Sequence, residues 1–356
     1  MASDVGADRT SRKGGAATIY DVAELAGVSP STVSRALGKP GRISAATETR
    51  IRAAAEQLNF RINPVARALH TGRTHTLALV VADITNPVIF DIVRGAEQAA
   101  SAGGYTLVIA ESQESGEAET EAVRRLLPSV DGVILATTRL ANPVIAELAR
   151  QKPLVLINRA VDGVAAILPD VKEGVAALLD HLFDLGHQSI AYLSGPATSW
   201  VSARRWEHLL EQSEQRGIAV VEIGPNAPTI DGGRAAIRRV RAANATAVVA
   251  FNDLIAIGLM QGLADAGIQV PDELSIAGFD DIFGSELIVP ALTTVRSQLE
   301  LAGKRATSHL LAQLRGDEAS VEEELLSTQL VVRGSTASSP ALKRDAGPRD
   351  QLSTMS

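Results

Sequence analysis

The hydrophobic residues of this chain follow two different patterns, which meet near residue 76. Before this point they recur at the three- to four-residue spacing of amphipathic helices, in three short pieces. Each piece opens with a hydroxyl residue that suits a helix N-cap: Thr18, Ser29 and Ser44. The pattern predicts a small helical domain over residues 17–60, followed by a linker over residues 61–75 that contains one short helical turn.

Beyond residue 76, short runs of Val, Ile, Leu and Ala alternate with amphipathic stretches of helix length. The runs are continuously apolar, which is typical of parallel strands in a sheet covered by helices on both faces. They are Leu77–Ala82, Leu107–Ala110, Gly132–Ala136, Leu154–Ile157, Ile190–Leu193, Val220–Ile223, Ala247–Phe251 and Leu274–Phe279. The pattern predicts an α/β body over residues 76–333, and spacing alone leaves open one large sheet, a barrel or two lobes.

Polar residues follow several of these predicted strands, at Asp83, Asn158-Arg159, Ser194-Gly195, Asn252-Asp253 and Asp280-Asp281. Because open α/β sheets bind ligands beyond the carboxyl ends of their strands, these residues mark a candidate site. Amides, carboxylates and a guanidinium suit the paired hydroxyls of a sugar or polyol. The candidates for such contacts are Asn158, Arg204, Asn252 and Asp280. Capping of the next helix is the alternative role of each strand-end Asn or Asp.

Composition and charge indicate that the two parts of the chain have different functions. The 356 residues are 46% hydrophobic and 3% aromatic, which is typical of globular domains with aliphatic cores. The net charge of −7 is uneven, because residues 1–75 hold eleven Lys and Arg against six Asp and Glu, and the remainder holds 23 against 35. A basic head on an acidic body is typical of a nucleic-acid-binding protein with a separate regulatory part. The polar, aperiodic stretches 1–16 and 334–356 predict disordered tails.

Several functional classes lack their sequence signals. No apolar run approaches the roughly 18 residues that span a bilayer, and the polar first residues are no signal peptide, so we expect a cytoplasmic protein without a membrane partner. Cysteine is absent, which excludes disulfides and thiolate chemistry. Phosphate-loop, dinucleotide, nucleophile-elbow and zinc-protease motifs are missing, and the six histidines lack metal-ligand spacing. We therefore expect no enzyme, cofactor or metal; a sugar-processing α/β enzyme and a solute-binding protein are the alternatives.

The first two predicted helices form a helix, turn and second helix over residues 18–37. Thr18 and Asp21 suit a capping box, Gly27 suits a left-handed helix end, and Ser29-Pro30 suits the start of the second helix. The apolar positions expected to share a core are Val22, Leu25, Val28, Val33 and Leu37.

Ser31, Thr32, Ser34 and Arg35 then fall on the outer face of the second helix. Short hydroxyls and Arg on one face can enter a major groove, where Arg reads guanine. From spacing alone, a plain corner of two helices is the alternative.

The stretch Thr18–Leu37, reading TIYDVAELAGVSPSTVSRAL, resembles the DNA-binding head of the lactose-repressor/galactose-repressor (LacI/GalR) family of bacterial transcription regulators. The resemblance covers nearly all of residues 17–336. Further matching motifs are Asn63–Leu69, which is the family's hinge helix, and Ile84–Pro87, Ile157–Arg159, Phe251–Asp253 and Gly278–Asp281. It implies a helix-turn-helix head and a body similar to periplasmic sugar-binding proteins.

In such a body two α/β lobes with parallel sheets are joined by three crossovers. The implied N-lobe is about 76–160 and 297–325, and the implied C-lobe is about 161–296 and 326–333. The effector would lie between the lobes. Asn86 and Phe90 would line one wall, Asn158 the floor, and Arg204, Asn252 and Asp280 the other lobe. The sequence departs from the family pattern near these positions, since Val88 and Ile89 precede Phe90 and no Gly-aromatic pair follows Arg204, so the effector's identity stays open.

For the head, the resemblance implies that Pro30, Ser31 and Arg35 approach base edges, and that Thr18, Tyr20, Ser29, Thr32 and Ser34 mostly contact phosphate. Pro30 donates no hydrogen bond, so base reading falls chiefly on Ser31 and Arg35. For Tyr20, a ring that covers the small core is an equal alternative.

The hinge has a physical argument of its own. Asn63 suits an N-cap, but a helix that begins there and ends near Leu69 is much shorter than the roughly 12 residues at which isolated helices become marginally stable. In the family the hinges of a dimer pair over the minor groove, where Leu69 would wedge into a base step beside Ala66. Taken together, the sequence predicts a homodimeric repressor whose affinity for double-stranded operator DNA is controlled by a small sugar-like effector.

Overall fold

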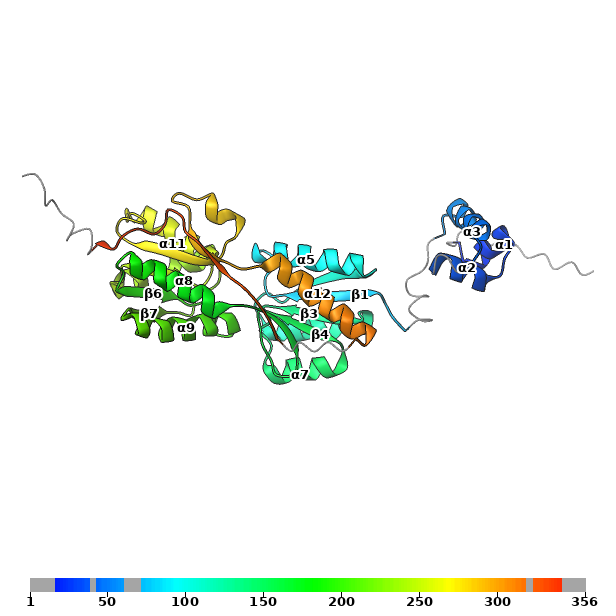
Figure 1. The fold of residues 1–356 in the computed structure, drawn as a ribbon, viewed down its shortest axis with the longest axis horizontal. Helices are drawn as coiled ribbons and strands as arrows, with labels where there is room; N and C mark the ends of the chain where they lie inside the picture. The colour runs from blue at the N-terminus through cyan, green and yellow to red at the C-terminus, as the bar shows by residue number, and fades with distance from the viewer. Residues whose placement is uncertain (1–16, 39–42, 61–71, 318–322, 341–356) are drawn as a thin grey trace, which may run out of the picture. The chain divides into compact units, whose positions relative to one another are not determined.

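The computed structural model describes residues 17–38, 43–60, 72–317 and 323–340. The chain forms two compact units, Met1–Thr74 and His75–Ser356. In the described part of the first unit the helices are α1 (Ile19–Ala26), α2 (Pro30–Gly38) and α3 (Ala45–Gln57), drawn in blue in Figure 1.

The ends of the first helices form as their residue types predict. Thr18 caps α1 in a reciprocal capping box, since its N–H donates to the Asp21 carboxylate at 2.7 Å and its hydroxyl accepts from the Asp21 N–H. These hydrogen bonds lower the pKa of Asp21. Gly27 ends the helix with a φ of 62°, the left-handed conformation that glycine adopts without strain. The Ser29 hydroxyl accepts from the Thr32 N–H at the start of α2, and the Ser44 hydroxyl caps α3.

The head has a small core of its own. Val22, Val33 and Ile51, one from each helix, are fully buried together, with alanines filling the space between them. Leu25 was predicted to join this core, and that prediction is wrong: its side chain is 45% exposed. The reason is helical phase, because the buried residues of α1 are Val22, Ala23 and Ala26, and the small Ala26 takes the place nearest the partner helices.

The body contains two six-stranded sheets. The first has the order β11-β5-β4-β3-β1-β2, and all its neighbours are parallel. The second has the order β12-β10-β9-β8-β6-β7, and only the edge strand β12 is antiparallel. The strands are β1 (Thr76–Val81), β2 (Thr106–Glu111), β3 (Gly132–Ala136), β4 (Leu154–Ile157), β5 (Ala165–Pro169), β6 (Ser189–Leu193), β7 (Ala219–Ile223), β8 (Ala247–Ala250), β9 (Ser275–Asp280), β10 (Thr293–Arg296), β11 (Glu323–Leu326) and β12 (Gln329–Val331).

All eight predicted strands are therefore confirmed. Of the three architectures that spacing alone left open, the body has two lobes. The helices of the body are α5 (Val88–Ala102), α6 (Gly116–Leu126), α7 (Asn142–Gln151), α8 (Val171–Asp184), α9 (Trp200–Arg216), α10 (Ile230–Ala243), α11 (Asp253–Asp265) and α12 (Leu299–Arg315), with short 3-10 turns η1 (Leu127–Ser129) and η2 (Phe283–Glu286).

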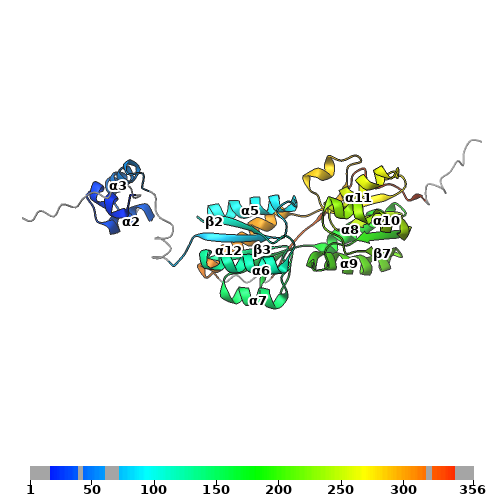
Figure 2. The same cartoon turned by 180° about the vertical axis from the view of Figure 1, so that it is seen from behind.

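Helices cover both faces of the first sheet, as its continuously apolar strands predict. Leu77 and Leu79 of β1 join the cluster that includes residues of α5 and α12, whereas Ala78 and Val80 join the cluster of α6 and α7. Successive residues of one strand thus bury on opposite faces. Figure 1 and Figure 2 show α5 and α12 on one side of this sheet and α6 and α7 on the other. In the second lobe α8 packs on α9 and α10 packs on α11.

Within the described residues the chain crosses between the two sheets three times: between β5 and α8, between β10 and α12, and between β11 and β12. The expected first crossing near residue 160 is corrected, because β5 pairs with β4 and β11 and the chain leaves the first sheet only after Pro169. The strand β5 escaped prediction because its five residues are too few and too rich in alanine for a periodic signal.

The tail predicted to be disordered from residue 334 instead begins with an ordered segment that packs on the second sheet. The buried Ser335 hydroxyl donates to the Ile276 carbonyl at 2.6 Å and accepts from the Thr293 N–H at 2.8 Å. The buried imidazole of His187 contacts the Ala337 carbonyl at 3.0 Å. Polar composition predicts exposure, but here the polar groups continue the edge of a sheet. Residues 341–356 lie outside the described residues.

A buried carboxylate organises the loop between β9 and β10. Asp253, in the first turn of α11, is fully buried and accepts from the Ile282 N–H, the Ser285 hydroxyl and the Thr294 hydroxyl at 2.5–3.1 Å. Burial, and secondarily the nearby charge of Asp280, raises the pKa of Asp253 to about 7. Gly278 allows this approach, because a Cβ there would overlap the carboxylate of Asp253.

Helices α5 and α12 touch backbone to backbone, and Gly303 makes this possible. A Cβ at Gly303 would overlap the carbonyl oxygen of Ile92 on α5. We therefore expect Gly303→Ala to destabilise the protein by about 1–3 kcal/mol, although alanine favours a helix interior by about 1 kcal/mol over glycine. Urea unfolding followed by circular dichroism measures the change. Ser308→Ala, at an exposed position of the same helix, is the control and should stay within about 0.5 kcal/mol of the parent.

The titration of Asp253 should make the free energy of unfolding depend on pH. Because its pKa is higher in the folded than in the unfolded protein, it contributes stability that is complete below about pH 4 and is lost as pH rises through about 7. Asp253→Asn does not titrate, so its free energy of unfolding should fall less than the parent's across this range. The exposed Asp231→Asn is the control. Parallel pH profiles for Asp253→Asn and the parent would contradict the assignment.

Candidate functional site

A cavity opens at the carboxyl ends of strands from both sheets. It is partly open to solvent and is lined by both polar and apolar residues. The first sheet contributes residues that follow β1, β3 and β4, and the second contributes residues that follow β8 and the last residue of β9. Parallel strands deliver their next residues to the same edge, which is why distant parts of the sequence meet here.

Four of the six residues predicted to contact an effector line this cavity: Asn86, Asn158, Asn252 and Asp280. Phe90 does not, and this prediction is corrected. Its side chain is 53% exposed, because it is out of phase with the buried face of α5. The lining from this helix comes instead from Val88 and Ile89, the two residues that separate Phe90 from the Asn-Pro motif.

Arg204 is also corrected, and its neighbour Arg205 takes its place. The guanidinium of Arg204 lies over the Trp200 ring and pairs with Glu207 on the outer side of α9. Arg205 is buried and lines the cavity. Helical phase separates the two, since Arg205 is four residues after the buried Val201 and four before the buried Leu209.

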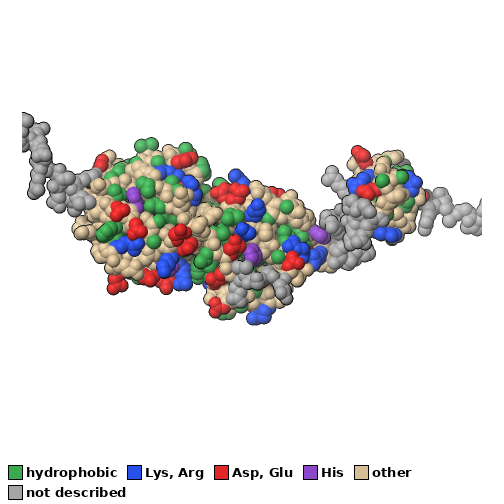
Figure 3. All heavy atoms as spheres, viewed as in Figure 1, with side chains coloured by type: hydrophobic (Ala, Val, Ile, Leu, Met, Phe, Trp, Pro, Cys, Tyr) green, Lys and Arg blue, Asp and Glu red, His purple; other side chains and the backbone are tan. Residues whose placement is uncertain are grey.

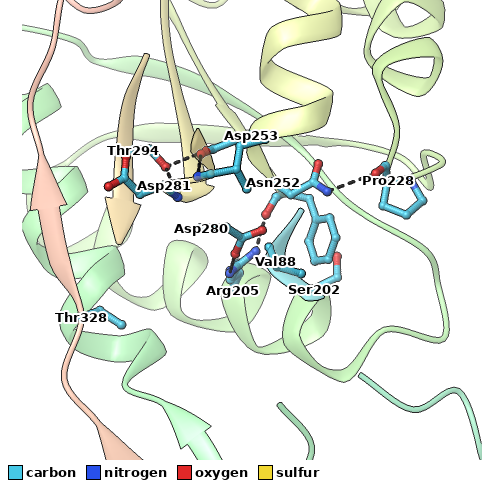
Figure 4. Close-up of polar contacts among 12 residues, drawn as sticks. Val88, Ser202, Arg205, Pro228, Asn252, Asp253, Asp280, Asp281, Thr294 and Thr328 are labelled. Atoms are coloured by element: carbon cyan, nitrogen blue, oxygen red, sulfur yellow. Dashed lines mark hydrogen bonds and ion pairs between the residues drawn. The ribbon is translucent and has the colours of Figure 1, made fainter. Parts of the chain in front are cut away.

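Arg205 and Asp280 form the charged centre of the second lobe's wall (Figure 4). The Arg205 guanidinium donates to an Asp280 carboxylate oxygen at 3.2 Å and to the Phe251 carbonyl, and it lies 4.1 Å from the centre of the Phe279 ring. Burial raises the pKa of Asp280, and the nearby Arg205 charge opposes this rise. These contacts hold the guanidinium in place on the cavity wall.

Asn252 both caps a helix and faces the cavity. Its Oδ1 accepts from the Ile255 N–H at 3.0 Å, and its Nδ2 donates to the Pro228 carbonyl at 3.1 Å (Figure 4). The side chain therefore caps α11 and also lines the cavity. One amide hydrogen and one lone pair of Asn252 have capacity for a ligand.

A second guanidinium stands on the wall from the first sheet. Arg139 follows β3, and its side chain is only 5% exposed. It donates to the Glu114 carboxylate at 2.6 Å and to the Thr137 carbonyl at 2.7 Å. Its backbone N–H donates to the buried Glu119, whose pKa burial raises. Sequence reasoning missed Arg139 and Glu114, although the position of Arg139 just after a predicted strand was an available signal.

The backbone at the strand ends adopts an uncommon conformation. Thr137, Asn158, Asp280 and Asp281 all have positive φ, from 55° to 107°, where residues other than glycine are uncommon. Three of them line the cavity. Such conformations concentrate where the fold holds side chains in place for binding. Asp281 is anchored in turn by ion pairs with Arg296 and Arg333 at 2.6 and 2.7 Å.

On the head, the predicted recognition face of α2 is exposed. Ser31, Ser34 and Arg35 are accessible, and Thr32 is half-buried. The Ser29 hydroxyl lies 2.9 Å from those of Ser31 and Thr32, and Arg35 Nε donates to the Ser31 carbonyl at 3.2 Å. Pro30 begins the helix and is half-buried.

Tyr20 and Thr18, predicted to contact phosphate, are exposed at the start of α1. The ring of Tyr20 is 70% exposed, which contradicts the alternative in which it covers the core. The remaining predicted DNA contacts, Asn63, Ala66 and Leu69, lie outside the described residues.

The excess positive charge of residues 1–75 lies outside the described residues. Within the described residues up to His75, four arginines balance four acidic residues, so the excess of basic residues belongs to residues 1–16, 39–42 and 61–71. The body shows acidic and basic side chains intermingled on the face in Figure 3. Within the described ranges, no helix has the length and apolar content to cross a membrane.

Comparisons with known proteins agree with this architecture. The model of bacterial regulatory proteins of the lacI family matches residues 18–63, and the model of the periplasmic binding protein-like domain matches residues 179–336. The chain is 32% identical to the ribose operon repressor of Halalkalibacterium halodurans over 90% of its own length and 97% of that protein. It is 33% identical to the transcriptional regulator GalR of Escherichia coli over 92% and 97%.

A solved structure gives the same answer in three dimensions. The lac repressor dimer bound to operator and an anti-inducer matches 91% of this chain and 100% of its own chain, with a TM-score of 0.82 and 27% identity. The chain therefore belongs to the lacI family of bacterial transcription regulators.

Proposed function

We propose that this protein is a cytoplasmic, homodimeric repressor that binds a specific operator through its head and responds to a small sugar-like effector in the cavity of its body. The observation that carries the proposal is the joining, in one chain, of a lacI-type helix-turn-helix unit to a polar strand-end cavity. The names of the relatives support it, since one is a ribose operon repressor and the lac repressor structure contains operator DNA.

Base reading falls to the exposed face of α2. Arg35 carries the fork of donors that matches the two acceptors of guanine, and Ser31 is adaptable as donor or acceptor. Phosphate contacts fall to Thr18, Tyr20, Ser29, Thr32 and Ser34, together with the basic residues in the segments 1–16, 39–42 and 61–71. Asn63, Ala66 and Leu69 form the hinge that pairs with its copy over the minor groove.

The cavity is suited to binding more than to catalysis. Two of its carboxylates are held by arginines, Glu114 by Arg139 and Asp280 by Arg205. The third, Asp83, accepts from the N–H and the hydroxyl of Thr85 at 2.8 and 2.6 Å. A general base needs a free lone pair within reach of substrate, whereas fixed and paired groups recognise hydroxyls.

Arg35→Ala should lower affinity for the operator by about 10- to 100-fold and leave affinity for random DNA less affected, because one bidentate contact to a base is worth about 1–3 kcal/mol. Selection from fragmented genomic DNA identifies the operator, and fluorescence anisotropy measures both affinities.

The control for this experiment is Arg52→Ala, which removes the same charge from the exposed face of α3, where Arg52 pairs with Glu48. Arg52→Ala should keep the discrimination between operator and random DNA. Unchanged discrimination in Arg35→Ala would remove Arg35 from base reading.

Asp280→Asn should weaken effector binding by at least about tenfold and leave operator affinity without effector near that of the parent. The substitution removes a charged acceptor from the cavity wall and releases the Arg205 guanidinium from its ion pair. Operator release is titrated with the effector by anisotropy, and the melting temperature reports folding.

Asp231→Asn is the matched control, because this carboxylate is exposed on α10 and does not line the cavity. A full effector response in a folded Asp280→Asn variant would place the ligand elsewhere.

A further inference from the structure

We propose that the effector is electrically neutral, a free polyhydroxylated molecule such as an unmodified monosaccharide, and that phosphorylated and carboxylated sugars are rejected. This inference rests on the proposed function and deepens it. It follows from the way in which the cavity's positive groups are already paired.

Neither arginine of the cavity is available as a free anion binder. Arg139 donates two hydrogen bonds to protein acceptors, the Glu114 carboxylate and the Thr137 carbonyl, at 2.6 and 2.7 Å. Arg205 is held by Asp280 and by the Phe251 carbonyl. A phosphate bound to either guanidinium would lie beside the carboxylate that already pairs with it, and the repulsion between the two anions opposes this binding.

The sum of the lining charges also opposes an anion. Three carboxylates, those of Asp83, Glu114 and Asp280, face two guanidiniums. Among the described residues, neither lysine nor histidine lines the cavity. A phosphate group adds roughly −1.5 to −2 charges at neutral pH to a wall that already carries an excess of negative charge.

Helix N-termini bind anions through free N–H groups, and the cavity lining includes N-cap or first-turn residues of four helices, α5, α9, α11 and α12. In α5, α9 and α11 one N–H of the first turn has a side-chain acceptor. The Val88 N–H of α5 donates to Asn86 Oδ1, the Ser202 N–H of α9 donates to Ser199 Oγ, and the Ile255 N–H of α11 donates to Asn252 Oδ1. Side-chain caps therefore already use part of the anion-binding capacity of three of these helix ends.

The groups with remaining capacity suit hydroxyls. The amides of Asn86, Asn158 and Asn252 line the cavity and each offers both a donor and an acceptor type. Arg205 is buried, and its Nε–H has no acceptor among the described residues. A sugar hydroxyl both donates and accepts, so it can serve an amide and a paired carboxylate at once without disturbing any ion pair.

The test compares matched pairs of ligands on the full-length protein. The pairs are ribose and ribose 5-phosphate, glucose and glucose 6-phosphate, galactose and galactose 1-phosphate, fructose and fructose 1-phosphate, and glucose and gluconate. Thermal shift identifies binding, isothermal titration gives the affinity, and operator release by anisotropy reports the response. We expect at least one neutral member to bind and its anionic partner to bind at least about tenfold more weakly.

Glu114→Gln tests independently whether the pairing of arginines with carboxylates causes the rejection of anions. It removes the charge paired with Arg139, so affinity for the phosphorylated partner should rise by roughly tenfold. Glu117→Gln, at an exposed position at the start of α6 outside the cavity lining, makes the same change of charge and should leave the preference as in the parent. The comparison on the parent protein stands even if Glu114→Gln fails to fold.

The outcomes separate the two proposals. Tighter binding of a phosphorylated or carboxylated member overturns the neutral ligand and leaves an effector-controlled repressor standing. If no member of any pair binds while the protein still selects an operator, the neutral sugar is overturned together with the sugar-like effector, and DNA binding by the head stands. Binding of the neutral member with rejection of its anionic partner supports the inference.

Discussion

The direction of the strands is the constraint on which the rest of the body depends. All neighbours in the first sheet and all but the edge strand in the second run parallel, so their carboxyl ends share one edge. A residue placed just after such a strand reaches that edge however far apart the strands are in sequence. Asp83 and Asp280 line one cavity for this reason. The helices on both faces keep the strands apolar, which concentrates the polar chemistry at their ends.

Burial of charge then decides what these ends can do. In a medium of low dielectric an unpaired carboxylate is costly, and each carboxylate here has partners suited to its depth. Asp280, at the cavity wall, has an arginine. Asp253, behind it and fully buried, has two hydroxyls and a backbone N–H, and its pKa rises to about 7. The loop that carries Asp280 and Asp281 is therefore held from behind by a hydrogen-bonded cluster, which keeps the cavity wall rigid.

The sequence predicted features that depend on neighbouring residues alone. It did not predict features that depend on the phase of a helix or on pairing with residues distant in the sequence. Capping at Thr18 and the helix end at Gly27 depend on neighbouring residues only, and both formed as predicted. Arg204 and Arg205 are adjacent, so their roles depend on which one shares the helical phase of Val201 and Leu209, and matching a motif by position chose the wrong one. The strand β5 and the segment around Ser335 are too short or too polar to signal themselves, because they are stabilised by strands distant in sequence.

In the proposed function, cavity walls from two lobes explain how a small ligand would control DNA binding. In the described residues three crossovers join the lobes. Because the connections are few, the orientation of one lobe relative to the other is the part of the body that can change most easily. A ligand that hydrogen-bonds to Asn158 on one wall and Asp280 on the other gains both contacts only in orientations that bring the walls to the right spacing. A tenfold change in operator affinity needs about 1.4 kcal/mol of such differential binding, which is about the worth of one or two hydrogen bonds. Rigid walls are what make this difference large, since a wall that followed the ligand would bind it equally well in every orientation and transmit nothing.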